Sequence, residues 1–216
     1  MPQEIDRRPI GARNASWAKS LTSILVRANI EPNQISIASV VFAAIGGALY
    51  YHVGTSTDSG TGFLIAAALC IPMRLLCNML DGMVAVEGGK QSKTGALFNE
   101  LPDRMADCFF LVGAGFAAKT GQVGIQLGWA ASLLAVLTAY IRAFGASQGL
   151  KQNFCGPMAK PQRMWLLAAA SIGSAVEEAT CSPPRVMTIA LAIIAIGSMA
   201  TCLRRTLDIQ KGLVQR

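Results

Sequence analysis

Residues 32–57 read PNQISIASVVFAAIGGALYYHVGTST and contain no formally charged side chain. Two more uncharged stretches, residues 120–141 and 186–203, hold 22 and 18 residues. A helix of about 20 apolar residues is long enough to cross the hydrocarbon core of a bilayer. Of the 216 residues, 52% are hydrophobic and 14% are charged, whereas soluble domains carry about 25% charged residues. The pattern excludes an ordinary soluble domain and predicts an integral membrane protein.

Three shorter apolar stretches reach spanning length only if they include charged residues near their ends. Lipid offers the backbone no hydrogen-bond partners, so each spanning segment is expected to be helical. We therefore predict an all-α integral membrane protein with six transmembrane helices. Their predicted ranges are 35–53, 62–80, 102–119, 123–144, 164–180 and 185–203.

The predicted chain has three parts: a cytoplasmic amphipathic segment 1–34, a six-helix membrane domain 35–203 and a basic cytoplasmic tail 204–216. Within the first part, residues 14–28 place Trp17, Leu21, Ile24 and Leu25 at helical spacing. Such a stripe is typical of a helix that lies in the membrane interface.

The basic residues predict the orientation of the six helices. With both termini on one side, that side holds Arg7, Arg8, Arg13, Lys19, Arg27, Lys90, Lys93, Lys151, Lys160, Arg163, Arg204, Arg205, Lys211 and Arg216. The opposite loops, 54–61, 120–122 and 181–184, hold no Lys or Arg. By the positive-inside rule both termini are cytoplasmic, and we expect a multi-pass protein of the cell (inner) membrane. The net charge of +7 is then explained mainly by the basic residues that orient the protein in the membrane. The sequence has no basic stripe with interleaved aromatic residues, the pattern that would indicate a nucleic-acid partner.

Polar residues at membrane depth gather at the cytoplasmic ends of two predicted helices. Arg74, Asn78 and Asp81 lie at i, i+4 and i+7. Asn99, Asp103 and Asp107 follow at i, i+4 and i+8. Ionisable residues in a membrane are costly and by default mark a functional site, so we expect one polar cavity open to the cytoplasm. The alternative is that these acids pair with Arg74, Arg104 and Arg142 only to let the helices pack.

Carboxylate and amide oxygens without histidine favour a hard divalent cation, Mg²⁺ or Mn²⁺, bound together with substrate phosphates. The segment between Asp81 and Glu100 is rich in small residues, including Gly82 and Gly95. Glycines of this kind allow backbone to approach a phosphate closely.

The string from Asn78 to Asp103 resembles the signature of the CDP-alcohol phosphotransferase (CDP-alcohol phosphatidyltransferase) family, D-x2-D-G-x2-A-R-x8-G-x3-D-x3-D. Every spacing matches, and Asp81, Gly82, Ala85, Gly95 and Asp103 are present. The six helices and the amphipathic N-terminal segment are also similar to the layout of this family. Three positions depart from the signature: Asn78 and Asn99 replace its first and third aspartates, and Val86 replaces its arginine.

The resemblance implies transfer of a phosphatidyl group from a CDP-alcohol such as CDP-diacylglycerol to a small alcohol acceptor, with release of CMP, in phospholipid synthesis. It implies that the four motif positions, Asn78, Asp81, Asn99 and Asp103, hold divalent ions (two in the family). It further implies that Asp103 is the base for the acceptor hydroxyl and that Gly82, Ala85 and Gly95 give the cytidine nucleotide room. Arg142, Lys160 and Arg163 match cations that in relatives receive a phosphate on the acceptor. Lys160 and Arg163 are equally well explained as positive-inside residues, whereas Arg142 is the better candidate because it lies deeper and has acids nearby to pair with.

The two asparagines leave several functions open. The protein is either an active enzyme whose metal site is rebuilt or holds a single ion, or an enzyme with altered substrate preference. In a rebuilt site, Glu100 and Asp107 are sources of replacement charge. A catalytically inactive relative that binds lipid or nucleotide as a regulator or scaffold is the alternative from another class. A small transporter is disfavoured because the ionisable residues cluster on one side. Small-residue faces such as Gly46–Gly47 suit either a homodimer or packing inside the chain.

Overall fold

A computed structural model of the chain describes residues 11–57, 59–90 and 95–215 and, within them, not the side chains of residues 11, 12, 96, 98 and 99. This part of the chain is all-α and has no strand, as predicted. After a short 3₁₀ turn, η1 (Gly11–Asn14), it forms seven α-helices. They are α1 (Ser16–Arg27), α2 (Pro32–Thr55), α3 (Thr61–Glu87), α4 (Gly95–Ala117), α5 (Gln122–Ser147), α6 (Lys160–Ala179) and α7 (Val186–Val214).

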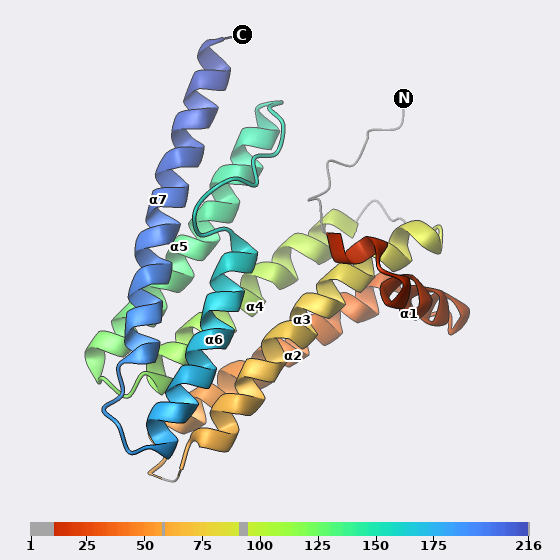
Figure 1. Ribbon diagram of the computed structural model, residues 1–216. Helices are drawn as coiled ribbons and strands as arrows, with labels where there is room; N and C mark the ends of the chain where they lie inside the picture. The colour runs from red at the N-terminus through yellow and green to blue at the C-terminus, as the bar shows by residue number, and fades with distance from the viewer. Residues whose placement is uncertain (1–10, 58, 91–94, 216) are drawn as a thin grey trace.

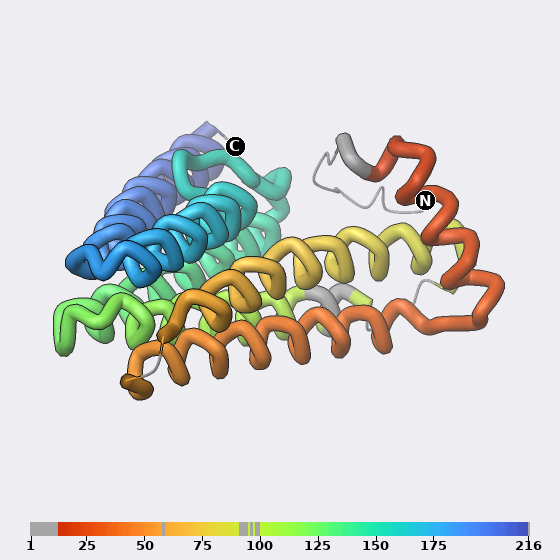
Figure 2. Tube along the Cα trace, turned by 60° about the horizontal axis from the view of Figure 1, so that its bottom comes forward, coloured from red at the N-terminus to blue at the C-terminus, as the bar shows by residue number. Residues whose placement is uncertain are grey.

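The long helices run alternately up and down. In Figure 1 the connections α2–α3, α4–α5 and α6–α7 lie together at the lower end, and α3 ends and α4 begins at the other end. Figures 1 and 2 show α7 beside both α5 and α6, with α2, α3 and α4 forming the rest of the bundle. The helix α1 lies across the far end of α3 and contacts it through Ala18, Met79 and Met83.

Local sequence sets the beginnings of two helices that matter for the site. At the start of α2 the backbone N–H of Glu31 donates to Gln34 Oε1 over 3.0 Å, and the Glu31 side chain accepts from the backbone at Gln34. This reciprocal capping box satisfies backbone donors that the first turn leaves free. Pro32 in α2 and Pro161 in α6 occupy the first turn, where a missing N–H costs nothing.

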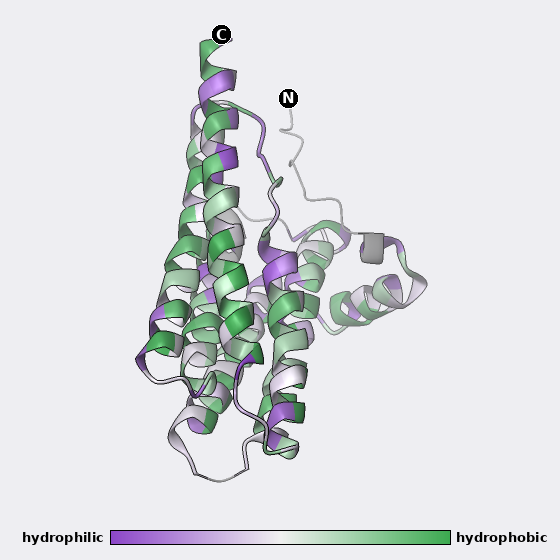
Figure 3. Cartoon of the chain, turned by 60° about the vertical axis from the view of Figure 1, so that its left-hand side comes forward, coloured by the Kyte–Doolittle hydropathy of each residue, from purple (hydrophilic) through white to green (hydrophobic). Residues whose placement is uncertain are grey.

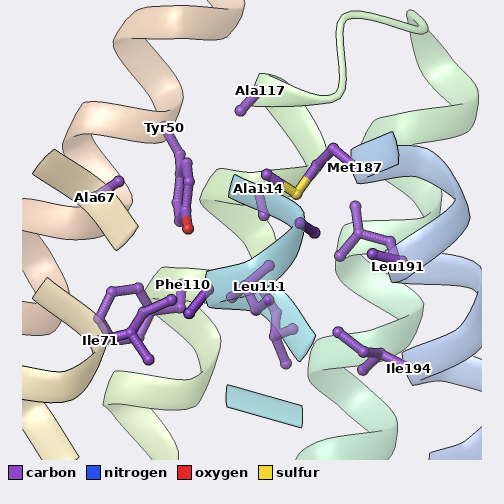
Figure 4. Packing of buried hydrophobic residues seen from close by; sticks show 14 of the residues in the cluster. Tyr50, Ala67, Ile71, Phe110, Leu111, Ala114, Ala117, Met187, Leu191 and Ile194 are labelled. Atoms are coloured by element: carbon purple, nitrogen blue, oxygen red, sulfur yellow. The ribbon is translucent and has the colours of Figure 1, made fainter. Parts of the chain in front are cut away.

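A core of small and aliphatic side chains holds the bundle together. Figure 4 shows Tyr50 from α2, Ile71 from α3, Phe110 and Leu111 from α4, and Leu191 from α7 meeting in it. The hydroxyl of Tyr50, which would be unsatisfied in this apolar core, hydrogen bonds with that of Ser171 on α6. Because the hydroxyl is hydrogen bonded, its burial does not incur the desolvation cost of an unpaired donor.

Glycines let α2 and α4 approach closely. A Cβ on Gly113 would lie 2.7 Å from the carbonyl oxygen of Gly47, and one on Gly47 would lie 2.6 Å from the carbonyl oxygen of Phe109. These distances are too short for any side chain, so the small residues are required where the two backbones touch. Of the two uses expected for Gly46–Gly47, the structure shows packing inside the chain.

Large apolar side chains also cover the outside of the bundle. Exposed examples occur on every long helix and include Ile37, Val41, Leu69, Leu97, Leu133, Trp165, Ile172, Ile189 and Ile196. Figure 3 shows hydrophobic residues along the helices and hydrophilic ones mainly near their ends, notably on the last turns of α7. Within the described residues four helices, α2, α3, α5 and α7, are both long enough and apolar enough to cross a membrane. A surface of this kind is suited to lipid.

Several helix limits differ from the predicted ones. The helix α4 begins at Gly95, before the predicted range 102–119, so Pro102 lies inside the helix and not at its start. The helices α3 and α7 continue to Glu87 and Val214. These extensions carry charged residues. Stretches without charge locate the apolar spans, so they do not predict where these helices end.

The stripe predicted on the N-terminal helix is divided in the structure. Trp17 and Ile24 are exposed, whereas Leu21 and Leu25 pack beside Ile35 and Val84. The face that α1 buries is centred on Ala18 and Thr22, whose small side chains allow close contact with α3. Residues 1–10 of the predicted N-terminal part lie outside the described residues.

Candidate active site

Asp103 on α4 is the centre of a charged network near the end of the bundle where α3 ends. Its Oδ1 accepts hydrogen bonds from Arg74 Nη2 over 2.9 Å and from Asn78 Nδ2 over 2.6 Å, both on α3. Its Oδ2 forms an ion pair with Lys160 at the start of α6 and lies 3.5 Å from Arg104 Nη2. Three helices therefore meet at this one carboxylate, as the spacing of the polar residues predicts for α3 and α4.

Asp107, one turn further along α4, lies between two buried arginines. Arg74 Nη2 is 3.4 Å from Asp107 Oδ1, and Arg163 Nη2 is 3.1 Å from Asp107 Oδ2. Arg74 is 0% exposed and Arg163 and Asp107 are each 1% exposed. Arg163 also donates to Thr138 Oγ1 and to the carbonyl of Met158. A buried charge is tolerated when it is paired and hydrogen bonded in this way, so Asp107 and Arg163 join the helices from inside.

Asp81 on α3 differs from the other two aspartates because one of its oxygens has no hydrogen-bond partner in the described part of the chain. Ser36 Oγ on α2 donates to Asp81 Oδ2 over 2.7 Å. Asp81 Oδ1 is buried and has no hydrogen-bond partner among the described residues. An unpaired buried carboxylate oxygen is unfavourable, and a bound cation would remove that cost.

The surface next to Asp81 is open. Among the described residues, a Cβ built on Gly82 would meet no atom within 4 Å outside its own helix backbone. Ala85 is half-buried and Val86 is exposed. Gly82, Ala85 and Val86 lie at i, i+3 and i+4 and thus share one helix face. Gly95, the third residue expected to make room for a nucleotide, is the first residue of α4.

The four expected metal-binding positions are only partly ready to receive an ion. Asp81 offers its free oxygen, whereas Asn78 Oδ1 accepts from Lys160 Nζ over 3.1 Å. Both Asp103 oxygens already have cationic partners. The side chain of Asn99 lies outside the described residues, and within them no three His, Cys, Asp or Glu side chains converge as a metal site. A divalent ion fits this donor set at Asp81, and a fuller set of ligands requires Lys160 to withdraw.

Arg142 at the end of α5 marks the outer edge of the network. It donates to Glu100 Oε1 over 2.5 Å and to Gln152 Oε1 over 2.8 Å, and its guanidinium lies 5.1 Å from the centre of the Phe154 ring. Glu100 is exposed. The side chains of Arg142 and Lys160 are 12% and 17% exposed, so both remain partly accessible candidates for an acceptor, whereas Arg163 is buried in its ion pair with Asp107.

Sequence reasoning missed two residues of this region. Ser36 looks like a packing serine in an apolar helix, and nothing in its local pattern distinguishes it. Arg205, counted only as a cytoplasmic cation, donates from Nε to the carbonyl of Cys155 and from Nη1 to the carbonyl of Thr138. Those bonds attach the segment before α6 to α5 and α7 and thereby help to position Lys160.

Comparison with known proteins agrees with the fold and with the family that the sequence resembles. The model of the CDP-alcohol phosphatidyltransferase family matches residues 29–203. The phosphatidylinositol phosphate synthase of Mycolicibacterium smegmatis is 25% identical over 193 residues, which cover 87% of this chain and 81% of the relative. The enzyme of the same name from Mycobacterium tuberculosis strain H37Rv is 27% identical over 203 residues, covering 88% and 86%.

Solved structures of a Mycobacterium tuberculosis phosphatidylinositol phosphate synthase share the fold. The structure with CDP-DAG bound has a TM-score of 0.73 at 20% identity and covers 90% of this chain and 94% of that one. The structure with manganese and citrate has a TM-score of 0.73 at 20% identity, covering 89% and 88%. With the family model matching most of the chain and the motif residues gathered at one end of the bundle, the protein belongs to the CDP-alcohol phosphatidyltransferase family.

Proposed function

We propose that this chain, an enzyme of the CDP-alcohol phosphatidyltransferase family, transfers the phosphatidyl group of a CDP-alcohol such as CDP-diacylglycerol to an acceptor alcohol and releases CMP. The observation that carries the proposal is the buried, unpartnered Oδ1 of Asp81 beside the open face at Gly82. That pair offers a cation-binding oxygen next to space for a nucleotide, at motif positions that the family model covers. The relatives named as synthases favour an active enzyme over an inactive regulator or scaffold.

We place all six long helices, α2 to α7, across the membrane, with both termini in the cytoplasm. The helices α4 and α6 are 23 and 20 residues long, and their charges pair with one another inside the bundle. Arg7, Arg8, Lys93 and Arg216, which support this orientation by sequence, lie outside the described residues. The charged network then opens to the cytoplasmic leaflet of the inner membrane, where a CDP-linked lipid and a water-soluble acceptor can meet.

A divalent ion, Mg²⁺ or Mn²⁺, would be held by Asp81 together with Asn78, Asn99 and Asp103. When bound it neutralises the diphosphate and stabilises the charge that develops on the leaving nucleotide. Gly82, Ala85 and Gly95 leave room for the cytidine nucleotide. Because a Cβ on Gly82 would meet no atom of the described residues within 4 Å, the ligand rather than a side chain would fill that space.

Asp103 is the proposed base. It takes the proton of the acceptor hydroxyl, the acceptor oxygen attacks the lipid-linked phosphorus, and the bond from that phosphorus to the CMP oxygen breaks with its electron pair on CMP. The Oδ2 of Asp103 is paired with Lys160, so this carboxylate accepts the proton only after the ammonium moves toward the incoming phosphates. Lys160 and Arg142 would then contact a phosphate on the acceptor, with Arg163 holding the start of α6 in place.

The proposal is tested by CMP release from CDP-diacylglycerol by the purified protein with Mn²⁺. Inositol phosphate, after which the relatives are named, is the first acceptor to try, followed by inositol and glycerol 3-phosphate. Asp81→Asn and Asp103→Asn should each reduce CMP release by about 100-fold or more, the size expected when a group that stabilises transition-state charge is removed. Asp208→Asn is the matched control, because Asp208 is exposed and bonds only to Asn153 among the contacts described. Equal rates for wild type and Asp81→Asn would overturn the proposal.

A further inference from the structure

Lys160 occupies an unusual position between two residues of the motif. Its ammonium forms an ion pair with Asp103 Oδ2 on α4 and donates to Asn78 Oδ1 on α3 over 3.1 Å. It therefore bridges the two helices through the same oxygens that a shared cation would use. The side chain of Lys160 is 17% exposed, so the ammonium is partly desolvated and depends on these partners.

The backbone around Lys160 is fixed, which makes this position a built feature. The N–H of Met158 donates to Thr201 Oγ1 over 3.0 Å, and the carbonyl of Met158 accepts from Arg163 Nη1 over 2.9 Å. Arg163 in turn is held by Asp107. Lys160 is the first residue of α6, and Pro161 sets the first turn of that helix.

The charges at the motif balance better with one divalent ion than with two. Two of the four motif positions are neutral, because residues 78 and 99 are asparagines. Asp103 already has Arg74, Arg104 and Lys160 around it. A second divalent ion, placed between Asn78 and Asp103 while Lys160 is bound there, would face the ammonium at close range and would gain only one carboxylate, so this half of the site repels a second ion.

The half of the site around Asp81, by contrast, favours a divalent ion. Asp81 Oδ1 has no partner among the described residues, and Asp81 lies within electrostatic range of Asp103 and Lys160. A free carboxylate oxygen beside the open face at Gly82 is where a cation brought in with a diphosphate finds a ligand.

We infer that Lys160 is a built-in cation that replaces one of two divalent ions, so that this chain binds a single divalent ion, at Asp81. The inference rests on the proposed function and adds one role to it: before the ammonium turns toward the acceptor phosphate, it supplies the second positive charge beside the diphosphate. The replacement of aspartate by Asn78 and the presence of Lys160 are then two parts of one change. The neutral Asn78 amide accepts a hydrogen bond from the Lys160 ammonium. A single carboxylate, Asp103, then balances the charge of the ammonium.

The test counts bound manganese in the full-length, detergent-purified protein, by titration and by electron paramagnetic resonance. The wild type should bind one Mn²⁺ per chain, with the spectrum of an isolated ion. Two ions with spin coupling in the wild type, or no bound ion at saturating Mn²⁺, would overturn the inference. Neither result depends on catalysis, and CMP release tests the proposed function separately.

A paired variant tests the role of Lys160 directly. Asn78→Asp combined with Lys160→Met restores a carboxylate and removes the ammonium, so it should bind a second Mn²⁺ and show spin coupling. Lys151→Met, in an exposed loop position, is the matched control and should remain at one ion. A folded double variant that still binds one ion would contradict the inference, and if the double variant does not fold, the wild-type count decides.

Discussion

Asp107→Asn should strongly destabilise the protein, because Asp107 is the carboxylate that joins two buried arginines. Its Oδ1 and Oδ2 lie 3.4 Å and 3.1 Å from Arg74 and Arg163, and all three residues are almost completely buried. Asparagine keeps the shape of the side chain, but it removes the negative charge and presents an amide N–H₂ to one of the guanidinium groups. Breaking a buried ion pair by removing one partner costs about 3–5 kcal/mol, because the other charge stays buried.

The two arginines are not equally protected against this change. Arg74 retains Asp103, whereas Arg163 retains the neutral acceptors Thr138 Oγ1 and Met158 O. We therefore expect the loss to fall mainly on the contact between α4 and α6. For a chain of this size 1 kcal/mol corresponds to about 2–4 °C in Tm, so the expected decrease is about 6–20 °C.

The assay is thermal unfolding of the detergent-purified protein, followed by tryptophan fluorescence, without metal or substrate. Asp208→Asn is the control for loss of one negative charge at an exposed site and should change Tm by no more than about 2 °C, since surface substitutions are usually within about 0.5 kcal/mol. A Tm for Asp107→Asn within 2 °C of wild type would refute the structural role of Asp107. It would also revive the alternative that Asp107 lends charge to the metal site.

Three further predictions concern space, packing and the acceptor. Gly82→Ala should leave Tm unchanged or raise it slightly, because a Cβ there meets no neighbour among the described residues and alanine favours helix over glycine by about 0.5–1 kcal/mol. It should nevertheless raise KM for CDP-diacylglycerol about tenfold, which corresponds to a loss of about 1.4 kcal/mol of binding free energy. An unchanged KM would show that the nucleotide lies elsewhere. Gly113→Val should destabilise the protein by about 1–3 kcal/mol, since its Cβ would lie 2.7 Å from the carbonyl oxygen of Gly47, and a wild-type Tm would contradict this close contact of α2 and α4. Arg142→Met should raise KM for a phosphorylated acceptor about tenfold and leave KM for the CDP-lipid unchanged, whereas equal effects on both would indicate a general role in folding.

The sequence predicts which helices carry the residues of this site better than it predicts which side chains those residues contact. The uncharged stretches locate long helices because few charges are tolerated in lipid, and the motif spacing places Asn78 and Asp103 on helix faces that do converge. The pairing of Lys160 with Asn78 and Asp103 could not be predicted, since it depends on how α6 meets α3 and α4 across distant parts of the chain.

Depth in the bundle was also beyond sequence reasoning. Arg163 and Arg142 both follow from the sequence as cations at cytoplasmic helix ends, but Arg163 is buried against Asp107 whereas Arg142 meets the exposed Glu100. The difference arises from helix rotation, because Arg163 is on the face of α6 that turns toward α4. The length of α4 before Pro102 was missed for another reason: a proline is most often found in the first turn of a helix, so the predicted range began at Pro102, whereas the helix begins at Gly95.

The most direct test of the central claim is the thermal stability of the purified protein with CDP-diacylglycerol, with and without Mn²⁺, in wild type and in Asp81→Ala. A ligand at about 100 times its Kd stabilises the folded state by about 2.7 kcal/mol, which corresponds to an increase in Tm of about 5–11 °C for a chain of this size. We predict this increase for the wild type only when Mn²⁺ is present, and its loss in Asp81→Ala. No shift with metal, or the same shift in both proteins, would contradict a metal-dependent CDP-alcohol site at Asp81.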